Sequence, residues 1–92
     1  MDNLQALIAK LAEIESVSSV ETAPLSAERA EQVGTAEGLA FACLFPAPGD
    51  RVARSEIYLA TAMYEAPENH DAIVEAVKQN MLSVLQKYEA TP

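Results

Sequence analysis

The chain has 92 residues, of which 14 are acidic and 6 are basic, so its formal net charge is −8 at pH 7. A chain of this length holds a single hydrophobic core, and we expect one domain spanning residues 1–92. An acidic surface repels phosphate groups, which argues against specific nucleic-acid binding. The first residues lack the basic and apolar segments of a signal peptide, and no apolar run reaches membrane-spanning length. We therefore expect no membrane partner, and synthesis and folding in the cytoplasm.

The first predicted element is an amphipathic helix over residues 3–15. Apolar side chains recur there at the spacing that places them on one helical face, namely Leu4, Leu7, Ile8, Leu11 and Ile14. Asp2 is a suitable N-cap, and Gln5 completes a capping box. The short β-branched run over residues 16–21 then predicts a strand.

Residues 22–38 form the longest polar stretch, which Pro24, Gly34 and Gly38 interrupt. Ser26 is placed to cap a single helical turn over residues 27–33. A connector of this length in a small domain is typical of a functional loop or of a segment that a partner orders.

Two apolar runs, residues 39–45 and 55–64, predict a β-hairpin whose proline-containing linker, residues 46–54, projects from the sheet. The second run alternates and places Tyr58 and Tyr64 on one side. The first run is apolar on both sides. The chain's own helices can cover one side of such a sheet, but the other side needs a further cover, for which a second subunit is the obvious candidate.

The predicted linker contains Arg51 and Arg54, two of the six basic residues. They pair either locally, with Asp50 or Glu56, or with an acidic surface of a neighbouring protein. Combined with residues of the second strand and of the connector, they make up our candidate interface: Arg51, Arg54, Tyr58, Tyr64, Glu28, Arg29 and Glu31.

Residues 65–71 break the second strand and start a closing helix, with Asn69 as a suitable N-cap. The apolar stripe of this helix covers about four turns and consists of Val74, Val77, Met81, Val84, Leu85 and Tyr88. The order of elements predicts an α+β fold, in which a three-stranded, mainly antiparallel sheet has N- and C-terminal helices packed on one face.

Residues that carry catalytic or metal chemistry are sparse. His70 is the only histidine, and the carboxylates near it are ordinary at a helix start. Cys43 is the only cysteine, and its apolar neighbours favour a buried, inert thiol. The three glycines are dispersed, so neither a phosphate-binding loop nor a dinucleotide fingerprint is present. We expect no catalytic residue, no metal site and no cofactor, and hence not an enzyme.

The order of elements resembles that of the tail terminator proteins of long-tailed bacteriophages, of the minor tail protein U type. The matching parts are the opening helix from Leu4 to Ile14, the strand with Val17 and Val20, the acidic connector, the hairpin around residues 46–54 and the closing helix. The resemblance covers nearly the whole chain.

The resemblance implies a structural virion protein. Six copies form a homohexameric ring that caps the finished tail tube, ends its polymerisation and offers a docking surface to the head. The implied partners are other copies of the chain, the tail tube protein and the head–tail connector protein. The implied locations are the host cytoplasm during assembly and the tail or neck of the virion. An acidic lumen would let DNA pass without binding it.

Three alternatives stay open. The chain could be a different small neck or tail component. It could instead be a soluble acidic regulator, a chaperone or an inhibitor that acts by protein binding as a monomer or dimer. A small enzyme would need His70 in a concave site.

Overall fold

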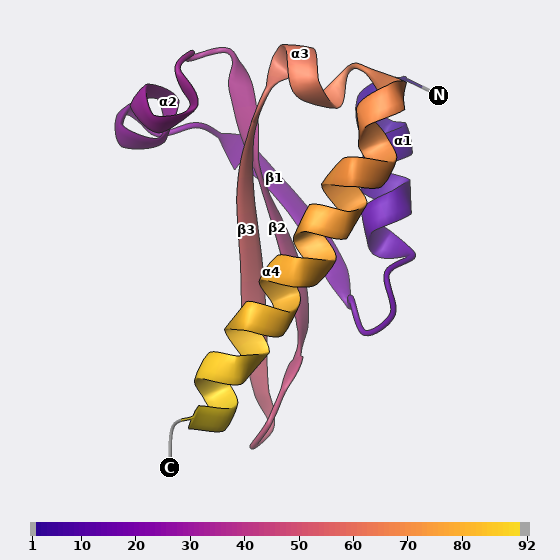
Figure 1. Cartoon of the computed structure of the whole chain (residues 1–92), viewed down its shortest axis with the longest axis vertical. Helices are drawn as coiled ribbons and strands as arrows, with labels where there is room; N and C mark the ends of the chain where they lie inside the picture. The colour runs from indigo at the N-terminus through magenta and orange to yellow at the C-terminus, as the bar shows by residue number, and fades with distance from the viewer. Residues whose placement is uncertain (1, 91–92) are drawn as a thin grey trace.

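The computed structural model describes residues 2–90 (Figure 1). In chain order the elements are α1 (Asn3–Ala12), β1 (Ser19–Pro24), α2 (Ala27–Val33), β2 (Gly38–Ala47), β3 (Arg51–Ala60), α3 (Thr61–Tyr64), the 3-10 turn η1 (Pro67–Asn69) and α4 (His70–Ala90). The three strands form one sheet in the order β1-β2-β3, and both pairs are antiparallel. The prediction of an α+β fold with a three-stranded antiparallel sheet and helices at both ends of the chain is confirmed.

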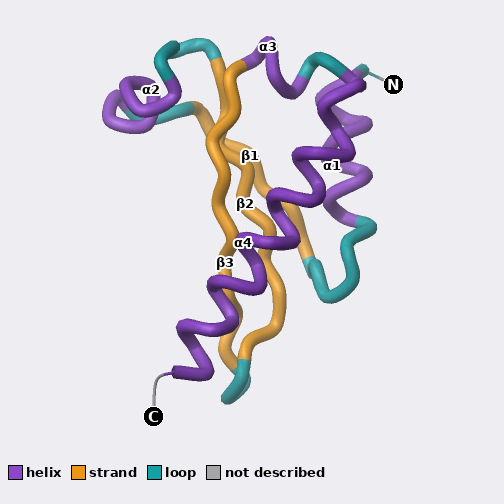
Figure 2. Tube along the Cα trace, in the orientation of Figure 1, coloured by secondary structure: helices purple, strands orange, loops and turns teal. Residues whose placement is uncertain are grey.

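The central strand β2 supplies the largest core side chains. Phe41, Cys43 and Phe45 alternate along β2 and therefore point to the same side of the sheet. They are buried in one apolar cluster with residues of both long helices, among them Leu7 of α1 and Val77 of α4. Figure 1 shows α4 crossing the sheet diagonally, with α1 beside its N-terminal half, and Figure 2 shows the three strands side by side behind α4.

The first helix begins as predicted and ends early. The Asp2 carboxylate accepts a hydrogen bond from the backbone N–H of Gln5 at 2.8 Å, which caps α1. The helix ends at Ala12 instead of residue 15, and Ser16 has a φ of 79° in the turn that follows. The strand predicted over residues 16–21 consequently lies at Ser19–Pro24.

The connector contains the helical turn that the sequence predicts. The Ser26 hydroxyl accepts a hydrogen bond from the N–H of Arg29 at 3.2 Å and so caps α2. Gly34 ends this helix with a φ of 94°, a conformation that glycine adopts without strain. The prediction of a helix over residues 27–33 is confirmed.

The prediction of a nine-residue linker in the hairpin is wrong. The ladder continues past Phe45, which pairs with Ala53, and it includes Pro46 opposite Val52. Only residues 48–50 form the turn, with positive φ at Gly49 and Asp50. Phe45 and Ala53 are both fully buried, so continued pairing buries apolar surface that a loose linker would leave in water.

The second hairpin strand ends earlier than predicted, at Ala60. Thr61–Tyr64 turn into α3, and this turn buries the Tyr64 ring in the core against Phe41, with ring centroids 5.6 Å apart in an edge-to-face contact. The prediction that Tyr64 shares a strand face with Tyr58 is therefore wrong. The same turn leaves the Met63 side chain 46% exposed.

We expect Phe41→Ala to lower the free energy of unfolding by about 3–5 kcal/mol, because it removes a fully buried ring at the centre of the core and leaves a cavity. Urea denaturation followed by circular dichroism measures the change. The matched control is Met63→Ala, since that side chain is 46% exposed and its loss should change stability by about 0.5 kcal/mol or less. Equal effects of the two variants would contradict this account of the core.

Candidate functional site

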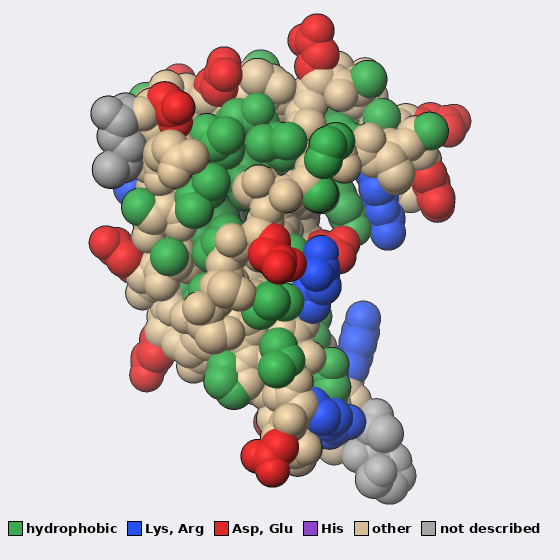
Figure 3. Space-filling view, turned by 180° about the vertical axis from the view of Figure 1, so that it is seen from behind, with side chains coloured by type: hydrophobic (Ala, Val, Ile, Leu, Met, Phe, Trp, Pro, Cys, Tyr) green, Lys and Arg blue, Asp and Glu red, His purple; other side chains and the backbone are tan. Residues whose placement is uncertain are grey.

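The sheet face opposite the core, here called the open face, carries every second residue of the three strands. The register places Glu21 of β1, Ala42 of β2 and Glu56 of β3 in one row, with Arg54 and Tyr58 in the rows on either side. Figure 3 shows acidic and basic side chains meeting near the middle of this face, with hydrophobic side chains around them. The open face is thus less apolar than the sequence of β2 alone predicts.

The charged side chains of the open face form one hydrogen-bonded network. Arg54 Nε donates to Glu56 at 2.6 Å, and its Nη1 lies 3.3 Å from a Glu21 carboxylate oxygen. The Tyr58 hydroxyl donates to the second Glu56 oxygen at 2.7 Å. Arg29 of α2 lies over the Tyr58 ring, 4.5 Å from its centroid. The connector therefore covers the Tyr58 end of the open face.

The network shifts the protonation equilibria of its members. The Tyr58 hydroxyl, followed by the Arg54 guanidinium, lowers the pKa of Glu56, because both donate to its charged form. The same hydrogen bond to Glu56 raises the pKa of Tyr58. The hydrogen bond to Glu56 also raises the pKa of Arg54. At neutral pH Glu56 and Arg54 are consequently both charged and hold each other in place.

Small side chains leave a hollow beneath these charges. It has a volume of about 400 Å³ and is lined by Glu21, Thr22, Ala23, Ala40, Ala42 and Arg54. The alanines of β1 and β2 provide its floor because they reach only a short way from the sheet. The hollow has no histidine or cysteine in its lining and lies between charges that are already paired.

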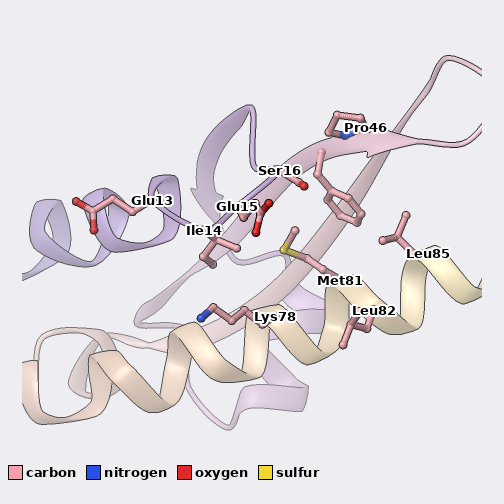
Figure 4. Close-up of a pocket in the computed structure, with 10 residues that line it drawn as sticks. Glu13, Ile14, Glu15, Ser16, Pro46, Lys78, Met81, Leu82 and Leu85 are labelled. Carbon is pink, nitrogen blue, oxygen red and sulfur yellow. The ribbon is translucent and has the colours of Figure 1, made fainter.

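An apolar groove lies at the opposite side of the sheet, between α4, the end of β2 and the segment that joins α1 to β1. Its volume is about 460 Å³, and its apolar lining consists of Ile14, Phe45, Pro46, Met81, Leu82 and Leu85. In Figure 4 Lys78 and Met81 point from α4 toward Ile14 and Glu15. Charges therefore flank an apolar floor, as at a surface that holds a protein segment. Three segments distant in sequence build this groove, so no local sequence pattern predicts it.

The predicted interface residues fall into three places. Arg29, Arg54 and Tyr58 come together on the open face. Glu28 and Glu31 are exposed on α2. Tyr64 lies in the core with 7% of its surface exposed, so it has little area to offer a partner.

Arg51 and Arg54 belong to β3 and not to a linker. Arg51 Nε donates to the carbonyl oxygen of Pro48 at 2.8 Å, and its guanidinium lies 4.6 Å from the centroid of the Tyr88 ring. Arg51 thus joins the hairpin turn to the end of α4. Of the two alternatives for these arginines, the local pairing with Glu56 is observed for Arg54.

His70 and Cys43 have structural positions. His70 is 1% exposed, and its Nε2 lies 2.7 Å from the carbonyl oxygen of Tyr64, which fixes the start of α4 against α3. Cys43 is buried in the core, and burial raises the pKa of its thiol. Within residues 2–90 no group of three or more histidine, cysteine or acidic residues is arranged to hold a metal ion. None of the helices that the structure describes has the length and apolarity to cross a membrane.

Comparisons with protein-family models, with curated proteins and with solved structures find no match to this chain.

We expect the stability of the chain to depend on the ionisation of Glu56. A carboxyl group whose pKa is lower in the folded than in the unfolded chain stabilises the fold above its unfolded pKa, and this contribution is lost as the pH falls through the folded pKa. The stability advantage of the wild-type chain over Glu56→Gln should therefore be present at neutral pH and disappear in acid. Urea denaturation at a series of pH values measures it.

Tyr58→Phe provides the control, since it removes the first cause of the shift and keeps the ring. The pKa of Glu56, followed by NMR of its carboxyl carbon, should rise in this variant. An unchanged pKa would show that the tyrosine hydroxyl does not act on Glu56.

Proposed function

We propose that this chain is a structural subunit of a phage virion, of the tail terminator type. Six copies close a ring that caps the tail tube, ends its polymerisation and joins the tail to the head–tail connector. The subunit acts in the host cytoplasm during assembly and afterwards in the tail or neck of the virion. It catalyses no reaction and works by binding other copies, the tube protein and the connector protein.

The observation that carries this proposal is the apolar surface at the turn end of the hairpin. The pairing of β1 ends at Leu44, so β2 and β3 continue past it as a two-stranded arm. One side of this arm borders the apolar groove with Leu82, which is 54% exposed, and the other side carries Val52, which is 64% exposed. A closed ring needs two different patches on each subunit, and the two sides of the arm offer two such patches.

The ring contact that we propose is smaller than the sequence predicts. The sequence favours a second subunit as the cover of the open face, but α2 and the ion pairs of Arg54 occupy much of that face. The ring contact that we propose is therefore limited to the arm and to the groove beside it.

The charge of the chain supports the same function. The formal net charge is −8 per copy, and Glu28 and Glu31 are exposed on α2. A ring of such subunits that places α2 toward its lumen would repel DNA from the wall and let it pass.

The apolar groove also favours a second candidate, a chaperone or regulator that binds another protein as a monomer or dimer. A groove of about 460 Å³ with an apolar floor would accommodate a few apolar side chains of a partner segment. The size of the native particle separates the two candidates, because only the first requires a ring.

We expect the purified chain to form a hexameric ring at high concentration, and Leu82→Asp to reduce the ring population by about tenfold or more, because it would bury an unpaired carboxylate at the contact. Native mass spectrometry and electron microscopy measure the assembly, and circular dichroism checks the fold. The control is Met63→Asp, which alters an exposed side chain on α3, away from the arm. A chain that never exceeds a dimer, or a ring that tolerates Leu82→Asp, would overturn the proposal.

A further inference from the structure

We propose that the outer edge of β3 binds the same edge of a second copy, so that the free chain forms a two-fold symmetric dimer with one continuous antiparallel sheet. A strand at the edge of a sheet leaves backbone N–H and C=O groups without a strand partner, and such an edge is a template for another strand. The strand order β1-β2-β3 makes β3 one of the two edges of this sheet.

The two edges differ in how they accept a strand. β1 has six residues, ends in Pro24 and begins beside Ser18, whose N–H reaches the carbonyl oxygen of Leu44 just outside the ladder. β3 has ten residues and contains neither proline nor glycine. Proline removes a donor and hinders pairing, so β3 is the better template.

The register identifies which backbone groups of β3 point outward. The N–H of Thr61 donates to the carbonyl oxygen of Glu37 at 2.9 Å, so odd-numbered residues of this segment point their backbone groups toward β2. The even-numbered residues Val52, Arg54, Glu56 and Tyr58 therefore direct their N–H and C=O groups to the outer edge. Two antiparallel strands can form bonded pairs only between such outward residues.

One register of two β3 strands matches all four outward residues. When the two-fold axis passes beside Ser55, Arg54 of each copy lies opposite Glu56 of the other. Val52 then lies opposite Tyr58. Opposite charges and a β-branched residue facing an aromatic ring are both favourable cross-strand pairs. Two-fold contacts of this kind use the same patch on both copies and are the commonest in soluble oligomers.

Neighbouring registers are penalised by the same charges. A shift of two residues in one direction places Arg54 opposite Arg54, and a shift in the other direction places Glu56 opposite Glu56. Like charges directly opposite each other are destabilising. Their side chains are about half and one third exposed in the single chain, at 50% and 36%, so both are accessible to a second copy. The charges thus deter foreign strands and select one self-pairing.

The helix above the edge supports this arrangement. Figure 1 shows the C-terminal end of α4 crossing β3 and reaching beyond its outer edge. In the two-fold pair this end lies above the second copy's Ile57 and Leu59, which are only partly buried in the single chain. The pairing therefore buries apolar surface on the core side in addition to forming backbone hydrogen bonds.

The edge pair goes beyond the proposed ring and does not depend on it. The ring contact uses the arm and the groove, whereas the edge pair uses the outer edge of residues 52–58 of β3, so the two contacts share Val52. A ring with one face for the tube and another for the connector has no two-fold axis that relates its copies. The edge pair consequently belongs to the free subunit at concentrations too low for ring assembly, and it opens when the ring forms at higher concentration.

A charge-exchange experiment tests the pairing and its register together. Arg54→Glu places Glu opposite Glu, and Glu56→Arg places Arg opposite Arg, so each variant alone should dimerise about tenfold more weakly or worse. An equimolar mixture of the two variants should form a heterodimer, because every facing pair is then Arg with Glu. The double variant with both changes should regain the homodimer. Analytical ultracentrifugation over a wide range of concentrations measures each case.

The control for added charge is Glu75→Arg, which makes the same change on the exposed surface of α4 and should leave the dimer intact. Rescue in the mixture excludes mere misfolding of the single variants. A monomeric wild-type chain, or a mixture that stays monomeric, would overturn the edge pair. A hexamer that is insensitive to both variants would support the ring and overturn the edge pair, whereas a rescued dimer without any hexamer would do the reverse.

Discussion

The ten-residue antiparallel ladder between β2 and β3 is the constraint on which the rest of the molecule depends. Its register decides that Phe41, Phe45 and Ala53 face the helices and that Ala42, Arg54 and Glu56 face away from them. A shift of one residue would exchange the two sets and place charges in the core. Both long helices and the Tyr64 ring pack on side chains that this one pairing has oriented.

The two faces of the sheet keep their apolar side chains away from water in different ways. The core face is covered by helices and buries its aromatic rings. The open face has small alanines on β2, and the long side chains of Arg54, Glu21 and Glu56 extend over them and pair with one another. The aliphatic part of such a side chain covers apolar surface while its charged end stays in water. The strongly apolar β2 can therefore be the central strand without exposing a large apolar surface on the open face.

The exposed apolar arm and the unpaired edge of β3 lie where this cover ends. The hairpin of β2 and β3 extends beyond the last residue that pairs with β1, which exposes the arm and the groove beside α4. Within the described chain β3 has no strand on its outer side. Both features arise from differences in element length, since α4 has 21 residues and α1 only 10, and β3 has ten and β1 only six. A long hairpin and a long helix project past their shorter neighbours and carry partly exposed apolar residues with them.

Sequence periodicity by itself determined the two amphipathic helices, the hairpin, the cap of α2 at Ser26 and the class of fold, because these follow from local spacing and capping. It did not locate the tight turn at residues 48–50 or the bend at Thr61, since continued pairing and the burial of Tyr64 against Phe41 decide them. The pairing of Arg54 with Glu56 is one of two alternatives that the sequence leaves open. Glu21 joins this pair because β1 lies on the other side of β2, so its side chain meets Arg54 across the central strand. The groove required three distant segments to meet. Local order is encoded along the chain, whereas contacts between remote residues exist only once packing has chosen the register.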